Sequence, residues 1–231
     1  MTILLTGSSR GIGAAIHVAL TDAGQPVIGH GTQSGIAADF TDPAGPRALW
    51  QAALEQAGGA IDVLINNAGV FEANPLDRDH DDWVGDWERT LRINLTAAAE
   101  LSRLAVRHWQ ERGTSGRIVN IASRTAYRGD SPAHWHYAAA KAGMVAMTKT
   151  IARGYAREGI YAFAICPGFT MTGMADDYLA SRGGEGLLAD IPLGKVAMPE
   201  EVAKVARFCA LEAPASMTGA VLDVNGASYV R

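Results

Sequence analysis

Short apolar runs alternate with longer amphipathic stretches along the 231 residues of the chain. A short apolar run bounded by turn residues is typical of a buried strand, and apolar positions three and four apart mark one face of a helix. Their alternation favours an α/β fold in which helices cover both faces of a doubly wound parallel sheet. The pattern predicts seven strands, at Ile3–Leu5, Pro26–Gly29, Ile36–Ala38, Ile61–Ile65, Arg117–Ile121, Ile160–Ile165 and Ala220–Val224.

Helical spacing fills most of the gaps between these strands. In the first gap one helix face is apolar, and it carries Ile12, Ala15, Ile16, Ala19 and Leu20 before Gly24. Further helices are predicted at Pro46–Ala57, from the acidic residues Asp81 and Asp82 to Leu91, and at Leu95–Arg112, Trp135–Arg157 and Pro199–Leu211. Because no repeat, low-complexity tract or linker interrupts the pattern, residues 1–231 are predicted to form one domain.

The connection between the second and third strands is unusually short. Only seven residues separate Ile28 from Ile36, which is too few for a helical crossover between parallel strands. Fully extended, that stretch reaches about 24 Å, whereas a return along a short strand needs about 13 Å, so a bare loop suffices. We therefore expect the sheet to lack a helix at this edge, which changes the surroundings of any ligand bound there.

Composition and charge narrow the function classes. The net charge of -4 offers no basic field, which excludes nucleic acid and anionic membrane as expected partners. The two cysteines, Cys166 and Cys209, indicate reduced thiols, and no targeting signal or run of roughly 18 apolar residues is visible. These features predict a cytoplasmic protein. No His/Cys spacing indicates a metal site.

The glycine-rich segment Thr6–Gly13 lies between the first strand and the first helix. In such folds a dinucleotide pyrophosphate binds here, against the N–H groups that begin the helix. Glycine is needed because a side chain would hold the phosphate away from the backbone. A plain glycine-rich turn is the alternative, but the flanking strand and helix favour a dinucleotide site.

A second segment of small residues, Asn66–Gly69, directly follows the strand that ends at Ile65. Ligands of doubly wound sheets lie beyond the carboxyl ends of the strands, and small residues there let a ribose approach the backbone. A tight Asn-Gly turn explains the same residues equally well.

A third group of residues is the candidate catalytic site. Ser123 follows a strand, and Tyr137 and Lys141 are four residues apart at the start of a helix, which places both on one face. A phenol is a poor acid at neutral pH, but a close cation favours the phenolate and lowers its pKa. Ser123 can therefore hold a substrate oxygen while Tyr137 gives or takes its proton. Taken alone, Tyr137 fits a half-buried helix residue and Lys141 a solvated one.

Together these segments make the chain similar to the short-chain dehydrogenase/reductase family in its compact form, and within it to the 3-oxoacyl-carrier-protein reductase-like group. The matching segments are TGSSRGIG at 6–13, NNAG at 66–69, Asn94 in LRINL, Ser123, YAAAK at 137–141, PG at 167–168 and VNG at 224–226. The resemblance implies a Rossmann-like fold and an oxidoreductase that transfers a hydride between NADP(H) and a carbonyl or secondary-alcohol substrate.

The resemblance also implies a role for each matching residue. Tyr137 is the acid–base residue, Ser123 anchors the substrate oxygen, and Lys141 binds the nicotinamide ribose and lowers the pKa of Tyr137. Asn94 holds a water that leads protons from Lys141 to solvent. The Thr170 backbone and the Thr172 side chain contact nicotinamide, and Asp39 contacts adenine. The full set expected to bind the cofactor is Gly7, Ser9, Arg10, Gly11, Ile12, Gly13, His30, Thr32, Asp39, Phe40, Asn67, Ala68, Gly69, Tyr137, Lys141, Pro167, Gly168, Thr170 and Thr172.

The second strand bears on the choice of cofactor. A site that prefers NAD(H) places an acidic side chain on the ribose 2′-hydroxyl at the end of this strand, but Val27–Thr32 contains none. Arg10 faces a 2′-phosphate in the alternative arrangement, and His30 and Thr32 add donors. We therefore expect NADP(H) to be preferred and NAD(H) to be the second cofactor. A solvated surface residue is the other interpretation of Arg10.

The residues that line the substrate pocket are expected to lie between Ser123 and Tyr137 and after Thr172. Its predicted wall is apolar with polar edges, and consists of Tyr127, Arg128, His134, Trp135, Phe169, Met171 and Met174. His134 and His136 are more typical of packing or helix-start residues than of catalysts. Residues 173–191 contain Gly183, Gly184 and Gly186 and are predicted to form a mobile lid. By resemblance, the two longest helices form a homodimer or homotetramer interface.

Two other functions fit the same fold. A non-catalytic NADP-binding sensor or scaffold typically loses the tyrosine or the lysine, whereas Asn94, Ser123, Tyr137 and Lys141 are all present. A nucleotide-sugar epimerase or dehydratase needs a substantial C-terminal substrate region, for which 231 residues leave no room. The sequence therefore favours the oxidoreductase.

Overall fold

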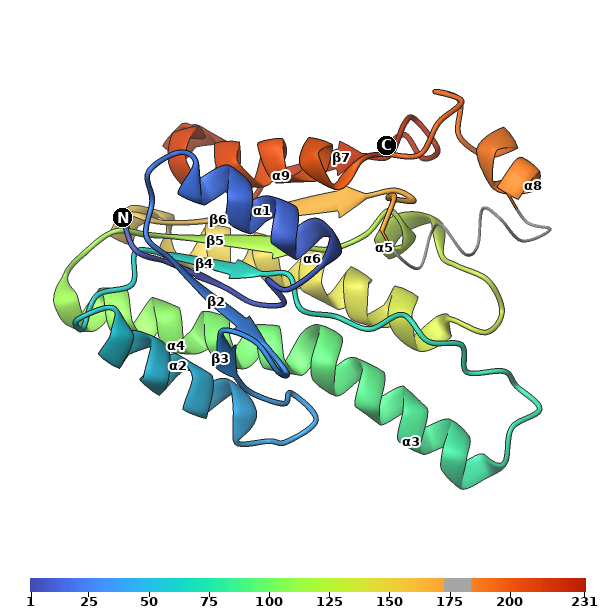
Figure 1. Cartoon of the computed structure of the whole chain (residues 1–231), viewed down its shortest axis with the longest axis horizontal. Helices are drawn as coiled ribbons and strands as arrows, with labels where there is room; N and C mark the ends of the chain where they lie inside the picture. Colours follow the sequence, from blue (N-terminus) through green and yellow to red (C-terminus); the bar gives the residue numbers. More distant parts are fainter. Residues whose placement is uncertain (173–183) are drawn as a thin grey trace.

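The computed structural model describes residues 1–172 and 184–231. Its seven-stranded sheet has the order β3-β2-β1-β4-β5-β6-β7, and neighbouring strands are parallel (Figure 1). The predicted doubly wound parallel sheet is confirmed. The strands are β1 (Ile3–Leu5), β2 (Val27–Gly31), β3 (Ile36–Ala37), β4 (Val63–Asn66), β5 (Gly116–Ile121), β6 (Ile160–Pro167) and β7 (Val221–Val224).

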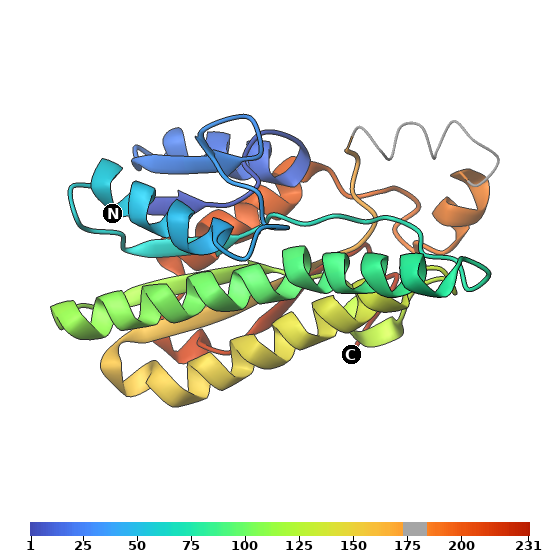
Figure 2. The same cartoon turned by 90° about the horizontal axis from the view of Figure 1, so that it is seen from below.

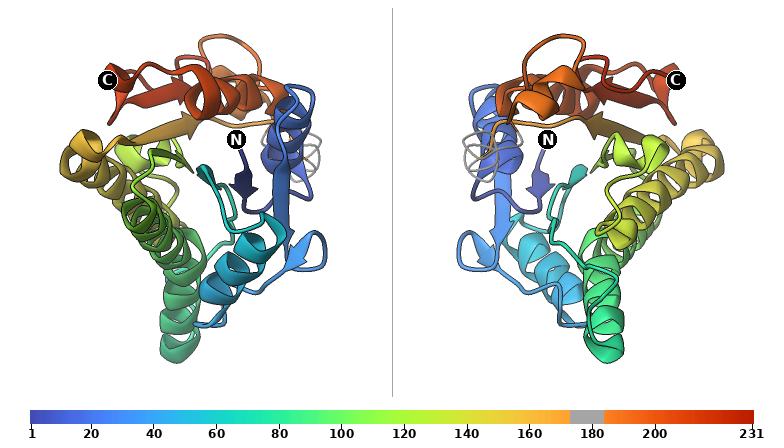
Figure 3. Two further views of the ribbon diagram at one scale, coloured as in Figure 1. Left: turned by 90° about the vertical axis from the view of Figure 1, so that its left-hand side faces the viewer. Right: turned by 90° about the vertical axis from the view of Figure 1, so that its right-hand side faces the viewer.

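Helices cover both faces of the sheet, as the end-on views of Figure 3 show. On one face α1 (Gly11–Thr21) packs against α9 (Pro199–Arg207). On the other lie α2 (Gly45–Gln56), α4 (Ala97–Arg112) and α6 (Trp135–Tyr155). Alternate residues of a strand point to opposite faces, so Leu4 belongs to the core under α2 and α4, and Ile3 and Leu5 to the core under α1 and α9.

The helix α3 (His80–Leu91) runs into α4 through a π-helical turn, η1 (Arg92–Thr96), so that the three form one long rod (Figure 2). The sequence pattern predicts two helices with a break before Leu95. That break is wrong, because residues 91–95 contain no glycine or proline and the π turn absorbs the change in apolar spacing. The turn carries Asn94 in a fully buried position.

The edge of the sheet lacks a helix between β2 and β3, as predicted. Residues 32–35 make the connection, and Gly35 has φ +65°, with only 2.2 Å between its ideal Cβ position and the carbonyl oxygen of Gly29. Right-handed crossovers would place the missing helix on the α1 face. A cavity of about 630 Å³ lies at this edge, lined by Ser8, Ser9, His17, Val27, Gly29, Ser34, Gly35, Ile36 and Gln56.

Several short elements complete the described part of the chain. They are α5 (Thr125–Arg128), α8 (Gly184–Ala189), the 3₁₀ turns η2 (Ala156–Glu158) and η4 (Ala215–Met217), and the π turn η3 (Phe208–Glu212) that extends α9. Within residues 1–172 and 184–231, every helix is too short or too polar to traverse a bilayer.

Candidate active site

The glycine-rich segment and the Asn66–Gly69 segment are held against each other beyond the carboxyl ends of β1 and β4. The Thr6 hydroxyl accepts hydrogen bonds from the backbone N–H of Asn67 at 2.9 Å and of Ala68 at 3.0 Å. The Asn67 amide in turn donates to the carbonyl oxygens of Thr6 and Gly7, at 3.0 and 2.9 Å. The predicted cofactor segments are therefore one structural unit rather than two separate turns.

Glycine is required at two positions of this unit. An ideal Cβ on Gly13 would lie 1.9 Å from the carbonyl oxygen of Gly7, and one on Gly7 would lie 2.8 Å from the Cα of Ala68. Gly7 also has φ +67°, where other residues are strained. The close approach of helix, strand and loop leaves the backbone exposed to a ligand at this point.

The N-terminus of α1 fits a bound pyrophosphate. Its N-cap residue, Arg10, makes no side-chain capping hydrogen bond, and the first turn contains no acidic residue. The N–H groups of the first turn are therefore free to bind an anion, and the helix dipole favours negative charge there. This chain's own residues thus fit the phosphate end of a dinucleotide.

His30 and Phe40, two of the predicted cofactor-binding residues, are buried. His30 is buried, its Nδ1 accepts from the Gly7 N–H at 3.2 Å, and its Nε2 lies 3.1 Å from the Ala38 carbonyl oxygen. Phe40 is buried against it, with the rings stacked 4.4 Å apart. The two side chains therefore link the glycine-rich segment to β3, and burial lowers the pKa of His30. Cofactor binding by His30 and Phe40 stays a prediction.

The other predicted residues on the adenine side are open to solvent. Ser9, Arg10, Thr32 and Asp39 are all exposed. Ser9 Oγ would lie 3.5 Å from a Cβ on Gly31 at the end of β2, so the glycine-rich segment and the β2–β3 loop are adjacent here. Asp39 accepts a hydrogen bond from the Thr41 N–H at 2.8 Å, which lowers the pKa of its carboxyl.

The segment after β6 returns to the glycine-rich segment. Thr172 is adjacent to Gly11, since a Cβ on Gly11 would lie 3.0 Å from Thr172 Cγ2. Thr170 is buried, and its hydroxyl donates to the Gly168 carbonyl at 3.2 Å. Pro167 ends β6, and Gly168 donates to the Val224 carbonyl at 2.8 Å. The structure thus brings the predicted nicotinamide segment to the helix that holds the predicted pyrophosphate site.

The predicted catalytic residues meet at the carboxyl end of β5. Ser123 is buried two residues beyond β5, and Tyr137 is half-buried in the first turn of α6. The hydroxyl groups of Tyr137 and Ser123 are hydrogen-bonded to each other. Two hydroxyl groups in contact can both bind one oxygen atom of a ligand.

Lys141 lies one helical turn from Tyr137 and is almost fully buried, with its Nζ 5.7 Å from the centre of the Tyr137 ring. The Nζ donates to the Ile121 carbonyl at 2.8 Å. Asn94 and Lys141 both border Gly69, where a Cβ would lie 3.0 Å from Asn94 Oδ1 and 3.7 Å from Lys141 Nζ. The Asn94 amide group also exchanges two 2.8 Å hydrogen bonds with the backbone of Val70.

Burial is the main influence on the pKa values of Tyr137 and Lys141. Burial raises the pKa of Tyr137 to about 12, and the hydrogen bond with Ser123 offsets this only in part. Burial also lowers the pKa of Lys141 to about 8. The lowering of the Tyr137 pKa by Lys141 that the resemblance implies stays a prediction, and in this structure the loss of hydration has the largest effect on the phenol.

The predicted substrate wall is found only in part. The ring of Phe71 stacks on His134 at 4.1 Å and meets Tyr137 edge-on at 4.8 Å, so these aromatic groups border the catalytic hydroxyl. Tyr127 points elsewhere, since its hydroxyl accepts from Arg231 at 3.1 Å and its ring stacks on Tyr229. The side chain of Trp135 packs edge-on against Trp83, and His136 is buried near Trp87.

The predicted lid lies partly outside the described residues. Met174 and Gly183 are among residues 173–183, which the structure does not describe. Gly184 and Gly186 belong to α8, and the segment after α8 is tied down by the Asp190 side chain and by a hydrogen bond from Leu193 to Gly226. Phe169 and Met171 are fixed by backbone hydrogen bonds with Ala197.

Sequence reasoning missed two groups beside the catalytic residues. One is Phe71, whose only signal is its position two residues after the Asn66–Gly69 segment. The other is Arg124, which binds Asp190 together with Arg128, a residue of the predicted substrate wall. The position of Arg124 directly after Ser123 was a usable signal, but nothing in the sequence pattern identified its partner.

A family profile described as Enoyl-(Acyl carrier protein) reductase matches residues 10–227. The 3-oxoacyl-(acyl-carrier-protein) reductase FabG of Vibrio cholerae is 34% identical over 242 residues, which cover 98% of this chain and 96% of the relative. FabG of Escherichia coli is 33% identical over 246 residues, with the same coverage.

Solved structures also match this chain over nearly its whole length. A candidate 2-deoxy-D-gluconate 3-dehydrogenase from Agrobacterium tumefaciens with bound NADP has a TM-score of 0.88 at 27% identity, covering 100% of this chain and 96% of its own. A candidate NAD(P)-dependent gluconate 5-dehydrogenase from Beutenbergia cavernae with bound NADP has a TM-score of 0.87 at 32% identity, covering 97% and 95%. This chain belongs to the short-chain dehydrogenase/reductase family of oxidoreductases.

Proposed function

We propose that the chain transfers a hydride between NADP(H) and a carbonyl or secondary-alcohol carbon, with Tyr137 as the acid–base residue. The observation that carries this proposal is the hydrogen-bonded pair of Ser123 and Tyr137 with the buried ammonium of Lys141 beside it. Both hydroxyl groups are placed to bind the same substrate oxygen, which polarises a carbonyl and aligns it for reaction.

The bound nicotinamide supplies the hydride in reduction and accepts it in oxidation. The protein residues hold the reactants and move the proton. In reduction Ser123 donates a hydrogen bond to the carbonyl oxygen, and Tyr137 transfers its phenolic proton to that oxygen as negative charge develops. Lys141, which is mostly protonated at pH 7 because its pKa is about 8, then stabilises the phenolate until solvent returns the proton.

The raised pKa of Tyr137 suits one direction of this reaction. With a pKa of about 12 the phenol is protonated at neutral pH and ready to donate. Oxidation of an alcohol requires the phenolate, which becomes accessible only when positive charge nearby lowers that pKa.

A substrate panel tests the proposed function. The chain is mixed with NADPH and with ketones, sugars, quinones and acyl thioesters, and the absorbance of the reduced nicotinamide is followed. We expect at least one class to cause oxidation that depends on both enzyme and substrate. If every class, the oxo acids of the next subsection included, leaves the absorbance unchanged while NADPH binds, the result contradicts hydride transfer and favours a cofactor-binding sensor.

We further propose NADP(H) as the preferred cofactor, because the exposed Arg10 lies at the N-terminus of α1 and no acidic residue ends β2. Arg10→Ala removes a cation that would bind the 2′-phosphate, so we expect kcat/KM for NADPH to fall about 10- to 100-fold, the value of a hydrogen bond to a charged group. The value for NADH should change little. Steady-state kinetics with both cofactors checks this, and a wild-type preference for NADH that survives the substitution contradicts it.

A further inference from the structure

We propose that Arg124 and Arg128 form a carboxylate-binding subsite for the substrate, so that the chain acts on oxo acids and the hydroxy acids formed from them. The inference rests on the proposed function, since it gives the charge class of the molecule that reacts at Ser123 and Tyr137. Its basis is the geometry of two arginines that face one carboxylate.

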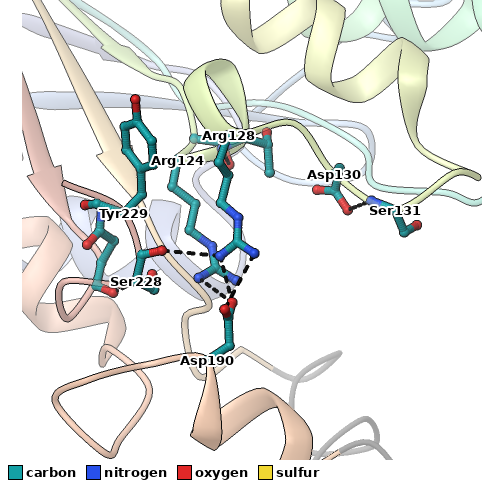
Figure 4. A network of polar contacts seen from close by, with 10 residues as sticks. Arg124, Arg128, Asp130, Ser131, Asp190, Ser228 and Tyr229 are labelled. Atoms are coloured by element: carbon teal, nitrogen blue, oxygen red, sulfur yellow. Dashed lines mark hydrogen bonds and ion pairs between the residues drawn. The ribbon is translucent and has the colours of Figure 1, made fainter. Parts of the chain in front are cut away.

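Figure 4 shows the guanidinium groups of Arg124 and Arg128 pointing at the carboxylate of Asp190. Arg128 Nη1 lies 2.6 Å and Arg124 Nη1 lies 3.3 Å from Asp190 Oδ2. Arg128 also donates to the Ser228 carbonyl at 3.2 Å. Two cations therefore share one carboxylate supplied by the protein itself, which shows that the pair accepts such a group.

Arg124 has more donors than the described structure uses. A guanidinium carries five N–H donors. The Arg124 side chain is only 12% exposed, yet Asp190 at 3.3 Å is its single recorded acceptor within residues 1–172 and 184–231. Burying a charged group with unused donors is unfavourable, and a ligand carboxylate would satisfy them.

The two arginines line a pocket of about 310 Å³ that is large enough for a small organic acid. Its other lining residues are Thr125, Gly129, Asp130 and Ser131. Thr125 is 9% exposed, and its buried hydroxyl has no hydrogen-bond partner in the part of the chain that the structure describes.

The residues that line the pocket directly follow Ser123 in the chain. Arg124 follows Ser123 in the chain, and the N–H of Thr125 donates to Ser123 Oγ at 3.2 Å. At the other end of the pocket, the negative charge of Asp130 acts on Tyr137 and raises its pKa. A carbonyl bound by Ser123 and Tyr137 and a carboxylate bound by the arginines can therefore belong to one molecule.

Asp130 refines the ligand class. Its carboxylate accepts from the Ser131 N–H at 2.7 Å and lies 3.9 Å from His134 Nδ1. The pocket thus has cationic donors at one end and an anionic acceptor at the other. A carboxylate that carries hydroxyl groups matches both ends, because the hydroxyl groups can donate to Asp130.

The kinetic test uses matched acids and esters with NADPH, namely acetoacetate and 4-oxopentanoate against their methyl esters. Loss of one charge-assisted contact is expected to lower kcat/KM for the acids about 10- to 100-fold in Arg124→Met and in Arg128→Met, mainly through KM. The values for the esters should stay within about threefold. Arg157→Met removes the same charge at the far end of the sheet, before β6, and should change neither.

A binding test separates this proposal from the proposed function. Malonate, a dicarboxylate that cannot be reduced this way, is titrated calorimetrically into the wild type and each variant. We expect binding to the wild type and Arg157→Met, loss in both subsite variants, and several-fold tighter binding in Asp190→Asn, where the competing carboxylate is gone. A purely structural ion pair predicts no such gain.

The outcomes are distinct. Malonate binding that needs both arginines supports the subsite even if no compound in the panel is reduced, in which case only the proposed function fails. Equal turnover of acids and esters by the wild type overturns the inference, as does malonate binding that is absent or unaffected by Arg128→Met. Arg128 is 34% exposed, so its replacement tests the idea even if Arg124→Met does not fold.

Discussion

Replacing Tyr137 with phenylalanine is expected to reduce turnover about 10²- to 10⁴-fold, the usual contribution of a positioned acid–base group. The substitution removes only the hydroxyl that is hydrogen-bonded to Ser123 and keeps the ring that contacts Phe71 edge-on. Because the phenol acts in the transition state, kcat should fall while NADPH affinity stays nearly unchanged. Steady-state kinetics and a fluorescence titration with NADPH measure the two quantities.

Tyr127→Phe is the matched control for this variant. Its hydroxyl binds Arg231 rather than the catalytic serine, so turnover should remain close to that of the wild type. Comparable turnover in Tyr137→Phe and Tyr127→Phe contradicts the role of Tyr137. A fall in NADPH affinity as large as the fall in kcat indicates a structural defect instead.

Replacing Lys141 with alanine should weaken cofactor binding and turnover together. Lys141 is buried beside Tyr137 and Gly69, where its ammonium is placed to bind the nicotinamide ribose and to stabilise the phenolate. We expect NADPH affinity to fall about 10- to 100-fold from the loss of a charged hydrogen bond. Turnover should fall by at least as much again, because the developing phenolate loses its neighbouring cation.

The pH dependence of NADPH binding tests the role of Lys141 in a second way. Burial lowers the pKa of Lys141 to about 8, so the ammonium is present below that pH and is lost as pH rises through it. NADPH affinity of the wild type should therefore decline above about pH 8, while that of Lys141→Ala should stay flat there. Lys149→Ala, an exposed lysine two turns later in α6, is the control. Unchanged affinity and turnover in Lys141→Ala would refute the double role.

The motifs could be placed from sequence because their chemistry depends on local spacing. A four-residue interval puts Tyr137 and Lys141 on one helix face, and a strand that ends before Ser123 brings that residue to the same edge. The predicted ends of the strands were less accurate. Ile61 was expected to begin the fourth strand, but β4 begins at Val63, and the Ile61 carbonyl accepts from the Trp109 indole at 2.7 Å. An apolar pattern reports burial rather than hydrogen bonding within the sheet.

Contacts between distant segments could not be read from the sequence. His30 was interpreted as a cofactor donor, but both of its ring nitrogens are satisfied by the backbone of Gly7 and Ala38. Asp190 lies more than 60 positions from the arginines that it binds. The effect of burial on the pKa of Tyr137 could not be read from the sequence either, because burial depends on every segment packed around the phenol.

The most direct test of the hydride-transfer account follows a label. NADPH deuterated at C4 of the reduced nicotinamide, on each face in turn, is supplied with the substrate that the panel identifies. The account predicts that one of the two labels appears on the new carbinol carbon of the product with the wild type, and that Tyr137→Phe forms almost no labelled product. NADPH oxidation with neither label in the product, or undiminished label transfer by Tyr137→Phe, would contradict it.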